Sequence, residues 1–543
     1  MRIFPATVYL VLTILLFLSC AETSDSPRVQ PPSKQDLDHA RRNGELAREG
    51  YLRCQRFVEG WLTFADASSG LIPRNLEADK DIWNAKDAAA DNYPFMVLTA
   101  ALTDQGLFHG RMKDMLAAET KLTSRVGTMP DTYSFSKKGY ANKEVDLDQI
   151  IFGASEYIKD GLIPLTEWLG ESPWSDRMME MLDDIWEYAP IETPYGNIPS
   201  DNVEVNGEML QALSRIYWMK QDVKYLEWAK RLGDYYLLGG HHPTKHSEAL
   251  RLRDHGCEIV SGLCELYITL SFVDERKKLK YQPLIQEMLD DILENGRNEH
   301  GLFYNIVNPK TGEQINAGVA DNFGYTLNGF YGVYLIDSIE TYRDAAVKAL
   351  DNLYQHYRNF DWERGSADGY ADAIEGALNL YNRLPVQSAS DWMDTETQVM
   401  WAKQQENGII EGWHGDGNFA RTTIMYNLWK TQGTYAHPWR KDLILGAIEK
   451  HDGIVLLMES EQDWKGLLHF DYARHKDILG LPIDWPRINQ FPEWFTVEDE
   501  LTYLLTNLET GDQREVSGEV LHSGYPLELK GGETQTWLVT LNE

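Results

Sequence analysis

The chain has 543 residues, of which 84 are acidic and 51 basic, and its formal net charge is −33. A hydrophobic content of 43% supports a sizeable core and excludes a wholly disordered chain. The acidity argues against nucleic acid or an anionic membrane as the main partner, because both bind clustered lysines and arginines.

The first twenty residues have the pattern of an export signal. Arg2 precedes an apolar run from Val8 to Leu18, and Ser19-Cys20 follows it directly. A small residue before a cysteine in this place resembles a bacterial lipoprotein cleavage site, although Phe17 departs from the preferred leucine. We therefore expect residues 1–20 to be a lipoprotein signal peptide, Cys20 to carry the lipid anchor, and residues 21–40 to form a polar tether. Simple secretion with loss of Cys20 is the alternative.

This pattern predicts an exported protein that is periplasmic or anchored to the outer membrane. The lipid anchor would be its only attachment to the membrane, because no other apolar run is long enough to span one. Three further cysteines, Cys54, Cys257 and Cys264, do not make a disulfide framework. Cys257 and Cys264 are too far apart along one predicted helix to form a disulfide, so we expect buried thiols.

From about residue 41 to 445 the apolar residues recur at helical spacing. Short segments of glycine with apolar residues, such as 195–199 and 300–303, are each followed by a polar loop and an apolar helix. Their spacing of about 50 to 65 residues fits one helical hairpin per repeat. We predict six or seven hairpins that close into an (α/α)6 toroid, with the starts of all inner helices around one polar mouth. An open solenoid is the alternative.

After about residue 450 the apolar residues alternate as they do in strands. Residues 451–458, 466–472 and 525–541 are predicted strands, and the last segment is predicted to form a hairpin that turns at Gly531-Gly532. Residues 446–543 are therefore expected to form a small C-terminal antiparallel β-domain, whose simplest role is to cap the toroid.

Carboxylates gather at the predicted starts of the inner helices. Such residues are most often helix caps, but residues 253–258 (Arg-Asp-His-Gly-Cys-Glu) carry more polar groups than a cap requires. Glycoside hydrolysis needs two converging carboxyl groups, and crowding raises the pKa of one of them. The catalytic candidates are Glu204, Glu258, Asp148 and Asp254, with a structural role as the alternative for each.

A second dense cluster is formed by residues 413–421 (Trp-His-Gly-Asp-Gly-Asn-Phe-Ala-Arg). Trp413 offers a stacking face, and Arg421 is predicted to pair with the carboxylate of a uronic acid. An ordinary salt bridge is the alternative for Arg421. The predicted substrate-binding residues are Asp91, Tyr93, Asn206, His255, Asp321, Asn322, Asp368, Trp413, His414 and Arg421.

Other catalytic motifs are missing from the sequence. It contains no GxSxG, HExxH or Walker motif, no EF-hand loop, and no dinucleotide fingerprint. The sequence therefore predicts no cofactor and no metal site.

Residues 41–445 resemble the bacterial (α/α)6-barrel glycosidases. Asp148-Gln149 and Glu204 fall near the places where unsaturated glucuronyl hydrolases carry their two catalytic aspartates, and residues 320–324 and 368–374 are similar to later inner helices of that family. Two departures are the glutamate at position 204 and the β-domain. The chain is also similar to zinc-cysteine arabinofuranosidases at residues 281–289 and Cys257, but it lacks the adjacent cysteine pair that their zinc site needs.

The arrangement of anchor, toroid, β-domain and acid-rich mouth looks most like glycoside hydrolase family 154. That resemblance implies an exo-acting β-glucuronidase, so we predict an enzyme that removes a terminal uronic acid from polysaccharide-derived oligosaccharides by paired-carboxylate catalysis. The alternatives are a polysaccharide lyase with Tyr93, His255 or His414 as its base, an unsaturated glucuronyl hydrolase, an epimerase, and a non-catalytic glycan-binding lipoprotein. The predicted partner is an oligosaccharide that contains uronic acid. The sequence does not determine the oligomeric state.

Overall fold

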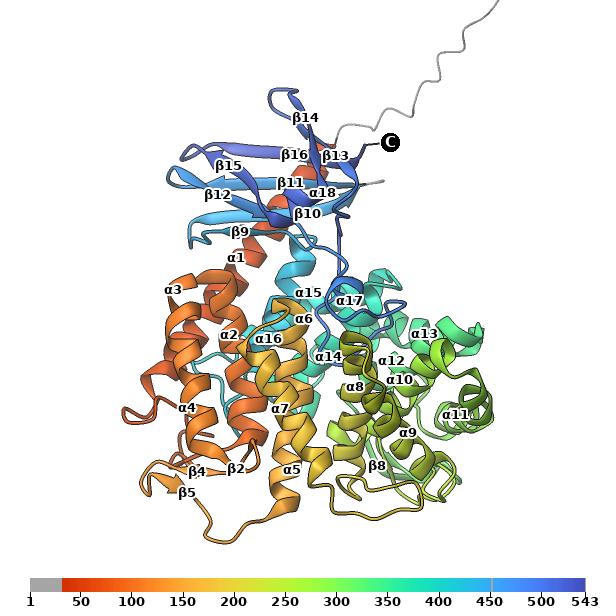
Figure 1. Ribbon diagram of the computed structural model, residues 1–543. Helices are drawn as coiled ribbons and strands as arrows, with labels where there is room; N and C mark the ends of the chain where they lie inside the picture. Colours follow the sequence, from red (N-terminus) through yellow and green to blue (C-terminus); the bar gives the residue numbers. More distant parts are fainter. Residues whose placement is uncertain (1–31, 451–452, 543) are drawn as a thin grey trace, which may run out of the picture.

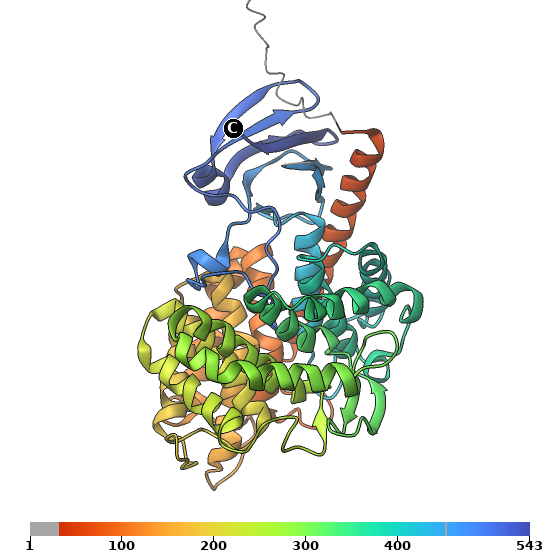
Figure 2. The ribbon, with the colours of Figure 1, turned by 90° about the vertical axis from the view of Figure 1, so that its right-hand side faces the viewer.

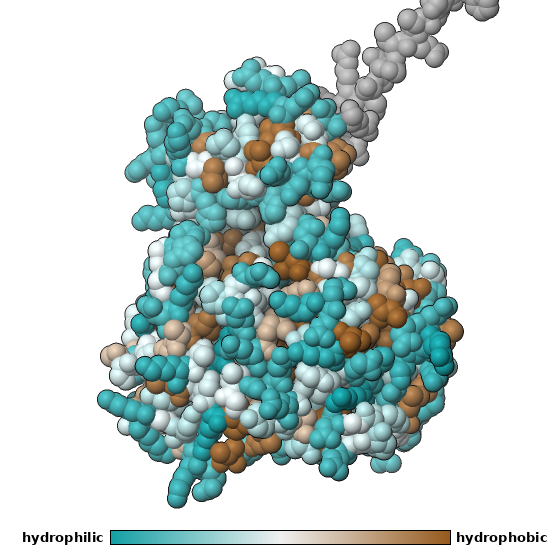
Figure 3. Space-filling view, in the orientation of Figure 1, coloured by the Kyte–Doolittle hydropathy of each residue, from teal (hydrophilic) through white to brown (hydrophobic). Residues whose placement is uncertain are grey.

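The computed structural model describes residues 32–450 and 453–542. A large helical region carries a smaller β region on one end (Figure 1 and, after a quarter turn, Figure 2). The predicted signal peptide, Cys20 and the first part of the predicted tether lie outside the described residues. On the face drawn in Figure 3, hydrophilic side chains predominate over both regions and hydrophobic ones are scattered among them.

The helical region alternates between two kinds of helix. One kind is amphipathic and buries a single side, and we call these the outer helices. They are α1 (Lys34–Thr63), α4 (Lys113–Thr123), α7 (Pro173–Glu187), α9 (Val223–Leu237), α11 (Glu275–Asn295), α13 (Glu340–His356) and α15 (Gln387–Trp401).

The other kind is buried on nearly all sides, and we call these the inner helices. They are α2 (Tyr93–Thr103), α5 (Leu147–Glu156) with α6 (Ile163–Leu169), α8 (Val203–Lys220), α10 (Glu258–Val273), α12 (Phe323–Asp337), α14 (Ala367–Tyr381) and α16 (Asn418–Lys430). With its preceding turn, α10 is long and apolar enough to span a membrane, but most of it is buried in the core.

Short helical turns complete the region. Three are π-helical: η1 (Ala85–Asn92) before α2, η2 (Phe108–Met112), which follows α3 (Gln105–Leu107), and η3 (Tyr157–Leu162) between α5 and α6. Two are 3₁₀ turns, η4 (Asp254–Cys257) and η5 (Trp362–Gly365), which precede α10 and α14.

Inner helices pack on their neighbours in chain order. Contacts run from α5 to α8, α10, α12, α14 and α16, then from α16 to α2, and η1 packs on η3 to close the path. Among the described residues this path passes through seven inner segments, each preceded by an outer helix, which agrees with the upper of the six or seven predicted hairpins and is one pair more than an (α/α)6 toroid has.

Glycines allow two of these helix pairs to approach closely. A Cβ atom on Gly324 would lie 2.4 Å from the Cα atom of Gly376, where α12 meets α14. On Gly207 it would lie 2.4 Å from the backbone carbon of Glu258, where α8 meets α10. Because real Cβ atoms do not come this close to backbone, these positions need glycine. The contacts bring the starts of neighbouring inner helices together.

The β region is built from two antiparallel sheets around a core that includes Leu456, Trp464 and Trp537. One sheet has the order β10 (Leu443–Lys450), β11 (Gly453–Ser460), β16 (Thr534–Leu541), β13 (Thr502–Asn507) and β14 (Gln513–Ser517). The other has the order β15 (Tyr525–Leu529), β12 (Trp464–His469) and β9 (Tyr435–His437). Two short helices, α17 (Arg474–Asp477) and α18 (Gly518–Ser523), lie in the connections.

The predicted hairpin over residues 525–541 is wrong. β15 pairs with β12, whereas β16 lies between β11 and β13. Gly531-Gly532 therefore carries the chain from one sheet to the other. The alternation of apolar residues correctly predicts strands in this segment, but alternation alone does not determine with which other strand each one pairs.

Three small sheets decorate the loops of the helical region. The first has the order β1 (Ile82–Trp83), β4 (Tyr133–Ser134) and β5 (Gly139–Tyr140). The second pairs β2 (Ser124–Val126) with β3 (Met129–Pro130), and the third has the order β6 (Leu250–Arg251), β7 (Tyr304–Val307) and β8 (Gln314–Val319).

Helix α1 joins the two regions. It begins at Lys34 with a capping box between Ser33 and Asp36, so it starts inside the predicted tether. Its first turns pack on β10, where Asp36 pairs with Lys450 and the Asn43 side chain donates to the carbonyl of Ala447 at 2.8 Å.

Residues 484–490 return from the β region to the centre of the helical region, and we call them the plug (Figure 1). Arg487 Nη2 lies 2.7 Å from Glu167 Oε1 of α6, and Arg215 of α8 donates to the carbonyl of Ile488 at 3.1 Å. Asn379 of α14 donates to the carbonyl of Gln490. All three partners lie late in their helices, so the plug closes the end opposite the helix starts. Cys54, Cys257 and Cys264 are buried free thiols, as expected.

Candidate active site

A cavity of about 480 Å³ lies among the starts of the inner helices. Its lining is dominated by carboxylates from several inner segments and the loops before them. They are Asp87, Asp91, Glu156, Asp160, Glu204, Asp254, Glu258, Glu363, Asp368, Asp372 and Asp416. The basic groups that line it are Lys86, Arg251, Arg253, His255, His414 and Arg421.

Two of the π-helical turns supply part of this lining. η1 carries Asp87 and Asp91, and η3 carries Asp160 directly after the end of α5 at Glu156. π-Helical turns inside α-helices are rare and frequently occur at functional sites. A Cβ atom on Gly161 would lie 2.6 Å from Pro94 at the start of α2 and 3.0 Å from the carbonyl oxygen of Ala90 in η1, so the close packing of η3 on η1 favours glycine here.

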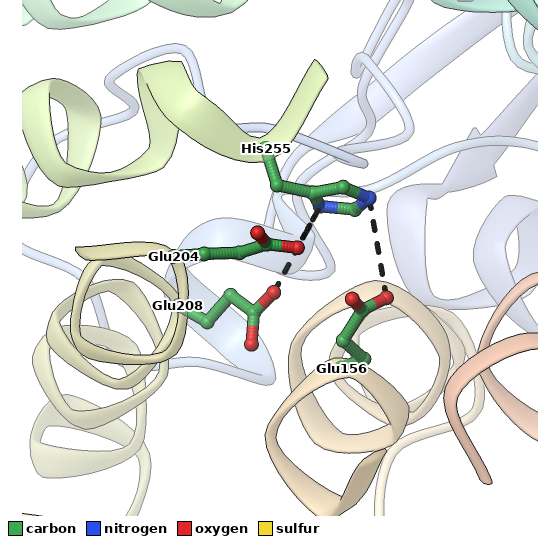
Figure 4. Close-up of side chains that lie close together, drawn as sticks. All are labelled: Glu156, Glu204, Glu208 and His255. Atoms are coloured by element: carbon green, nitrogen blue, oxygen red, sulfur yellow. Dashed lines mark ion pairs between the residues drawn. The ribbon is translucent and has the colours of Figure 1, made fainter. Parts of the chain in front are cut away.

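His255 lies among the carboxylates of two inner helices (Figure 4). Its Nδ1 atom is 4.0 Å from Glu204 Oε1 and 3.8 Å from Glu208 Oε1, and these glutamates are one turn apart on α8. Its Nε2 atom is 4.0 Å from Glu156 Oε2 at the end of α5. The side chains point toward one another from three elements, and we call Glu156, Glu204, Glu208 and His255 the His255 cluster.

The backbone of the turn η4, which carries His255, is held in place by contacts from neighbouring loops. Asp254 has a left-handed backbone with φ of 51°, and its N–H donates to Asn322 Oδ1 at 2.5 Å. Arg251 pairs with the Asp254 carboxylate. A non-glycine residue in this conformation persists only where its surroundings hold it, so neighbouring loops fix the direction of His255.

Two glutamates of the His255 cluster have buried carboxylate oxygens without a hydrogen-bond partner. Glu208 is 0% exposed and both of its carboxylate oxygens lack a hydrogen-bond partner, as does Oε1 of Glu156, which is 2% exposed. Burial, together with the nearby carboxylates, raises the pKa values of Glu156 and Glu208 well above the usual range. Although burial opposes it, Glu156 and other acids raise the pKa of His255.

Glu258 differs from these two glutamates because both of its carboxylate oxygens accept hydrogen bonds. Its Oε1 atom accepts from Lys159 Nζ at 2.5 Å, and its other oxygen accepts from Gln211. Lys159 also contacts Asp160 Oδ1 at 2.7 Å. Burial alone would raise the pKa of Glu258, but the Lys159 ammonium and His255 lower it to about 2. Glu258 is therefore a buried, ionised carboxylate at neutral pH.

A second histidine lies near a different set of acids. His414 Nε2 is 3.7 Å from Asp87 Oδ1 and 3.6 Å from Asp91 Oδ2, and we call these three residues the His414 cluster. Asp87 also accepts from Arg74 Nε at 2.6 Å and from the Asn84 amide at 2.5 Å. Burial raises the pKa of Asp91 to about 7, and despite its own burial the acids raise that of His414 to about 9.

Arg421 lies in the cavity wall but is committed to neighbouring acids. Its Nη2 atom is 2.7 Å from both Asp372 Oδ1 and Glu375 Oε2, which are close together on α14. Its Nη1 atom donates to Asn418 and to Asn489 of the plug at 2.9 Å each. With a side chain that is nearly buried, Arg421 forms the salt bridge that was the alternative to an anion hook.

The cavity brings together ten of the predicted site residues and excludes four. Those that line it are Glu204, Asp254, Glu258, Asp91, His255, Asn322, Asp368, Trp413, His414 and Arg421. Asp148, Tyr93, Asn206 and Asp321 do not.

The four excluded residues have other surroundings. Asp148 is exposed in the first turn of α5, two residues after the N-cap Asp146. Tyr93 donates to the carbonyl of Met112 and accepts from Trp174 in the core, which removes it as a base. The Asn206 amide donates to Ser200 and to Tyr236. Asp321 is buried beside the cavity, and burial raises its pKa.

Several residues that line the cavity or lie directly behind its wall are not predicted from the sequence. Glu156, Lys159 and Asp160 lie inside a long apolar run, and three charges in such a run were the available signal. Glu208 follows Glu204 by one turn, on a helix that is otherwise buried. Asn489 comes from the plug, whose sequence carries no comparable signal.

Comparison with known proteins gives only distant similarities. No family model and no curated protein matches the chain. A family 76 glycoside hydrolase from a bovine Bacteroides thetaiotaomicron strain superposes with a TM-score of 0.41 at 16% identity, over 58% of this chain and 76% of that one.

Two further structures are similarly distant. An inactive variant of an α-1,6-mannanase of Salegentibacter sp. HEL1_6, in complex with a mannotetraose, has a TM-score of 0.40 at 12% identity, over 70% of this chain and 97% of that one. A family 88 glycosyl hydrolase from Bacteroides vulgatus has a TM-score of 0.36 at 13% identity, over 50% and 89%. Because all three TM-scores lie below 0.5, these similarities do not assign the chain to a family.

Proposed function

We propose that this protein is a glycoside hydrolase with an (α/α)-toroid fold that removes a terminal uronic acid from polysaccharide-derived oligosaccharides. The observation that carries the proposal is the convergence of carboxylates from several inner segments on one cavity. Glu204 Oε1 and Glu258 Oε1 lie 4.0 and 3.8 Å from the same nitrogen of His255. Their separation therefore stays below the upper limit of roughly 9.5 Å for glycosidase pairs.

The two carboxylates have different surroundings, which suits different roles. The ion pair with Lys159 keeps Glu258 ionised, as a base or nucleophile must be. Glu204 lines the cavity and, among the described residues, has no lysine or arginine partner that would hold it ionised, so we assign the general acid role to this member of the pair. Asp254 lines the cavity but is paired with Arg251, so we do not assign it a catalytic role, and Asp148 and the family 154 assignment have no support from this geometry.

Binding of a sugar is supported by the rim of the cavity. Trp413 lines the cavity and is 79% exposed, so its ring is available to stack on a sugar. The plug closes the opposite end, and a closed-ended cavity suits the end of a chain more than an internal segment. We therefore infer exo-action.

A uronic acid requires a cation that is not already paired. Arg253 and Lys86 line the cavity, and neither takes part in an ion pair among the described residues. Nε of Arg253 is buried without a partner. Arg253 therefore replaces Arg421 as the proposed partner of the sugar carboxylate.

The test uses paired oligosaccharides with and without a non-reducing terminal glucuronic acid, incubated with residues 21–543. Chromatography should detect free glucuronic acid only from the acidic partner. Glu258→Gln and Glu204→Gln should each lower the rate by about 10² to 10⁴-fold, and Arg253→Met should raise KM on the acidic substrate. Full activity of both glutamine variants would refute the proposed pair. Retention of intact sugar without release would indicate a binding protein instead.

We also propose that the chain is exported and anchored through Cys20, on the sequence pattern alone. Metabolic labelling with a radioactive fatty acid should mark the wild-type protein and not Cys20→Ala. Unlabelled wild-type protein in the culture medium would support simple secretion.

A further inference from the structure

We propose that Glu156, Glu208 and His255 bind a divalent transition-metal ion, Zn²⁺ or Mn²⁺, at the wall of the cavity, which Glu156 and His255 line. The candidate ligand atoms of the His255 cluster, one per residue, lie within 4.8 Å of one another. Figure 4 shows the glutamates and the imidazole directed at the same small space. This differs from the sequence-based expectation that the chain has no metal site.

The distances within the cluster do not fit direct hydrogen bonds. His255 Nδ1 lies 3.8 Å from Glu208 Oε1, and Nε2, the other ring nitrogen, lies 4.0 Å from Glu156 Oε2. Hydrogen bonds of this kind need about 2.7 to 3.2 Å between heavy atoms. Two ligands of one Zn²⁺ ion, each about 2 Å from the metal, are instead about 3 to 4 Å apart. An ion binds one nitrogen of His255, and with one ligand atom per residue the atoms of the cluster lie within 4.8 Å of one another, close to that spacing.

The unpartnered oxygens give an independent indication. Both oxygens of Glu208 and one of Glu156 are buried without a hydrogen-bond partner. Lys159 does not contact them, because it is occupied by Asp160 and Glu258. A buried carboxylate with no partner is costly, and protein groups supply too little positive charge here.

The ligand set points to the class of metal. Two or three carboxylate oxygens with one imidazole nitrogen suit Zn²⁺ or Mn²⁺, whereas Ca²⁺ prefers six to eight oxygens. Three protein ligands would leave an open position. Glu204 is the most exposed carboxylate of the cluster, and it lies beside that position on the cavity side. An oxygen of the substrate would fill it, and this last step alone rests on the proposed function.

The experiment measures metal binding and does not depend on a substrate. The full mature chain is stripped with a chelator, then titrated with ZnCl₂, MnCl₂ and CaCl₂ by calorimetry, and its metal content is measured by elemental analysis. We expect one equivalent of Zn²⁺ or Mn²⁺ per chain and a higher Tm on binding. Absence of retained metal and of binding heat would overturn the proposal, and tighter binding of Ca²⁺ would overturn the assigned class.

Variants connect the binding to these residues. Glu208→Gln and Glu156→Gln should each weaken binding by more than the roughly 10 to 100-fold that second-shell changes cost. Asp91→Asn, which alters a carboxylate beside the other cavity histidine, is the matched control and should bind metal normally. Equal affinity in Glu208→Gln and the wild type would overturn the site.

Folding of the variants is checked by the same measurements. Without metal, Glu208→Gln should be about as stable as the wild type, because it replaces a buried carboxyl group whose oxygens have no partner with a neutral amide of similar size. With metal, only the wild type and Asp91→Asn should gain stability. A metal-induced rise of Tm that persists in Glu208→Gln would count against the proposal. If that variant does not fold, the stoichiometry of the wild type and Glu156→Gln decides.

Discussion

The His255 cluster and the His414 cluster share one cavity and a similar composition, but they differ in how their charges are balanced. In the His414 cluster, the Arg74 guanidinium and the Asn84 amide both donate to Asp87. In the His255 cluster, Glu208 has no donor for either oxygen. Similar residues therefore make a protein-balanced site on one side and a site with unmet charge on the other. The difference lies in the neighbours and not in the histidines.

Removing Lys159, which pairs with two buried carboxylates beside the His255 cluster, should have the largest effect on stability. Lys159→Met leaves Glu258 and Asp160 without their shared partner, and both are buried. Loss of one member of a buried ion pair costs about 3 to 5 kcal/mol, and hydrolysis should also fall because Glu258 would no longer be held ionised. Urea denaturation would measure the change. The corresponding Arg74→Met should cost less, since Arg74 is partly exposed. An equal or larger loss in Arg74→Met would contradict this ranking.

The His414 cluster should make stability depend on pH. The folded pKa of His414, about 9, lies above its unfolded value of 6.5. Its contribution is therefore complete below pH 6.5 and is lost as the pH rises through 9, by at most about 3 kcal/mol. Tm measured from pH 6 to 10 should fall more steeply in the wild type than in His414→Gln. Parallel curves for the two proteins would exclude His414 as the source.

Close packing beside the His255 cluster should be sensitive to a single methyl group. Gly207→Ala places a Cβ atom against the backbone of Glu258 and should destabilise the fold by about 1 to 3 kcal/mol. Gly110→Ala is the matched control, because nothing lies within 4 Å of its Cβ position. Chemical denaturation should separate the two variants. Similar midpoints would show that α8 and α10 can move apart without cost.

The smallest effect is expected outside both clusters. Asp148 is exposed and does not line the cavity. Asp148→Asn should therefore change hydrolysis by less than about twofold, since a general acid or base contributes about 10² to 10⁴-fold. A loss of about 10² to 10⁴-fold in steady-state assays would instead show that Asp148 is a catalytic residue.

The sequence predicted the location of the cavity better than its contents. Polar residues at helix starts identified His255, Glu258 and His414, because every inner helix starts on the same side. Glu156 and Asp160 were missed because the π-helical turn η3 interrupts a run that reads as one helix. Residue spacing in the sequence does not reveal a π-helical turn, which holds one more residue than an α-helical turn and so changes which side chains share a face.

The role of Arg421 was misjudged for a different reason. Its position in the cavity wall follows from its place in the first turn of α16. Its ion-pair partners cannot be predicted from that place, because Asp372 and Glu375 come from a neighbouring helix and become the nearest acids only after the helices pack. The plug was missed entirely, since no periodicity connects a loop of the β region with the helical region.

The plug has a consequence for the order in which the protein matures. Asn489 is 1% exposed, and its amide donates to Asp160 Oδ1 at 2.6 Å across 329 residues of chain. Its backbone N–H donates to Glu375 at 2.6 Å, and its side-chain oxygen accepts from Arg421. Contacts of such long range form late in folding. A nascent or C-terminally shortened chain thus lacks the residue that connects three buried charges, and the cavity is completed only when nearly the whole polypeptide has been made.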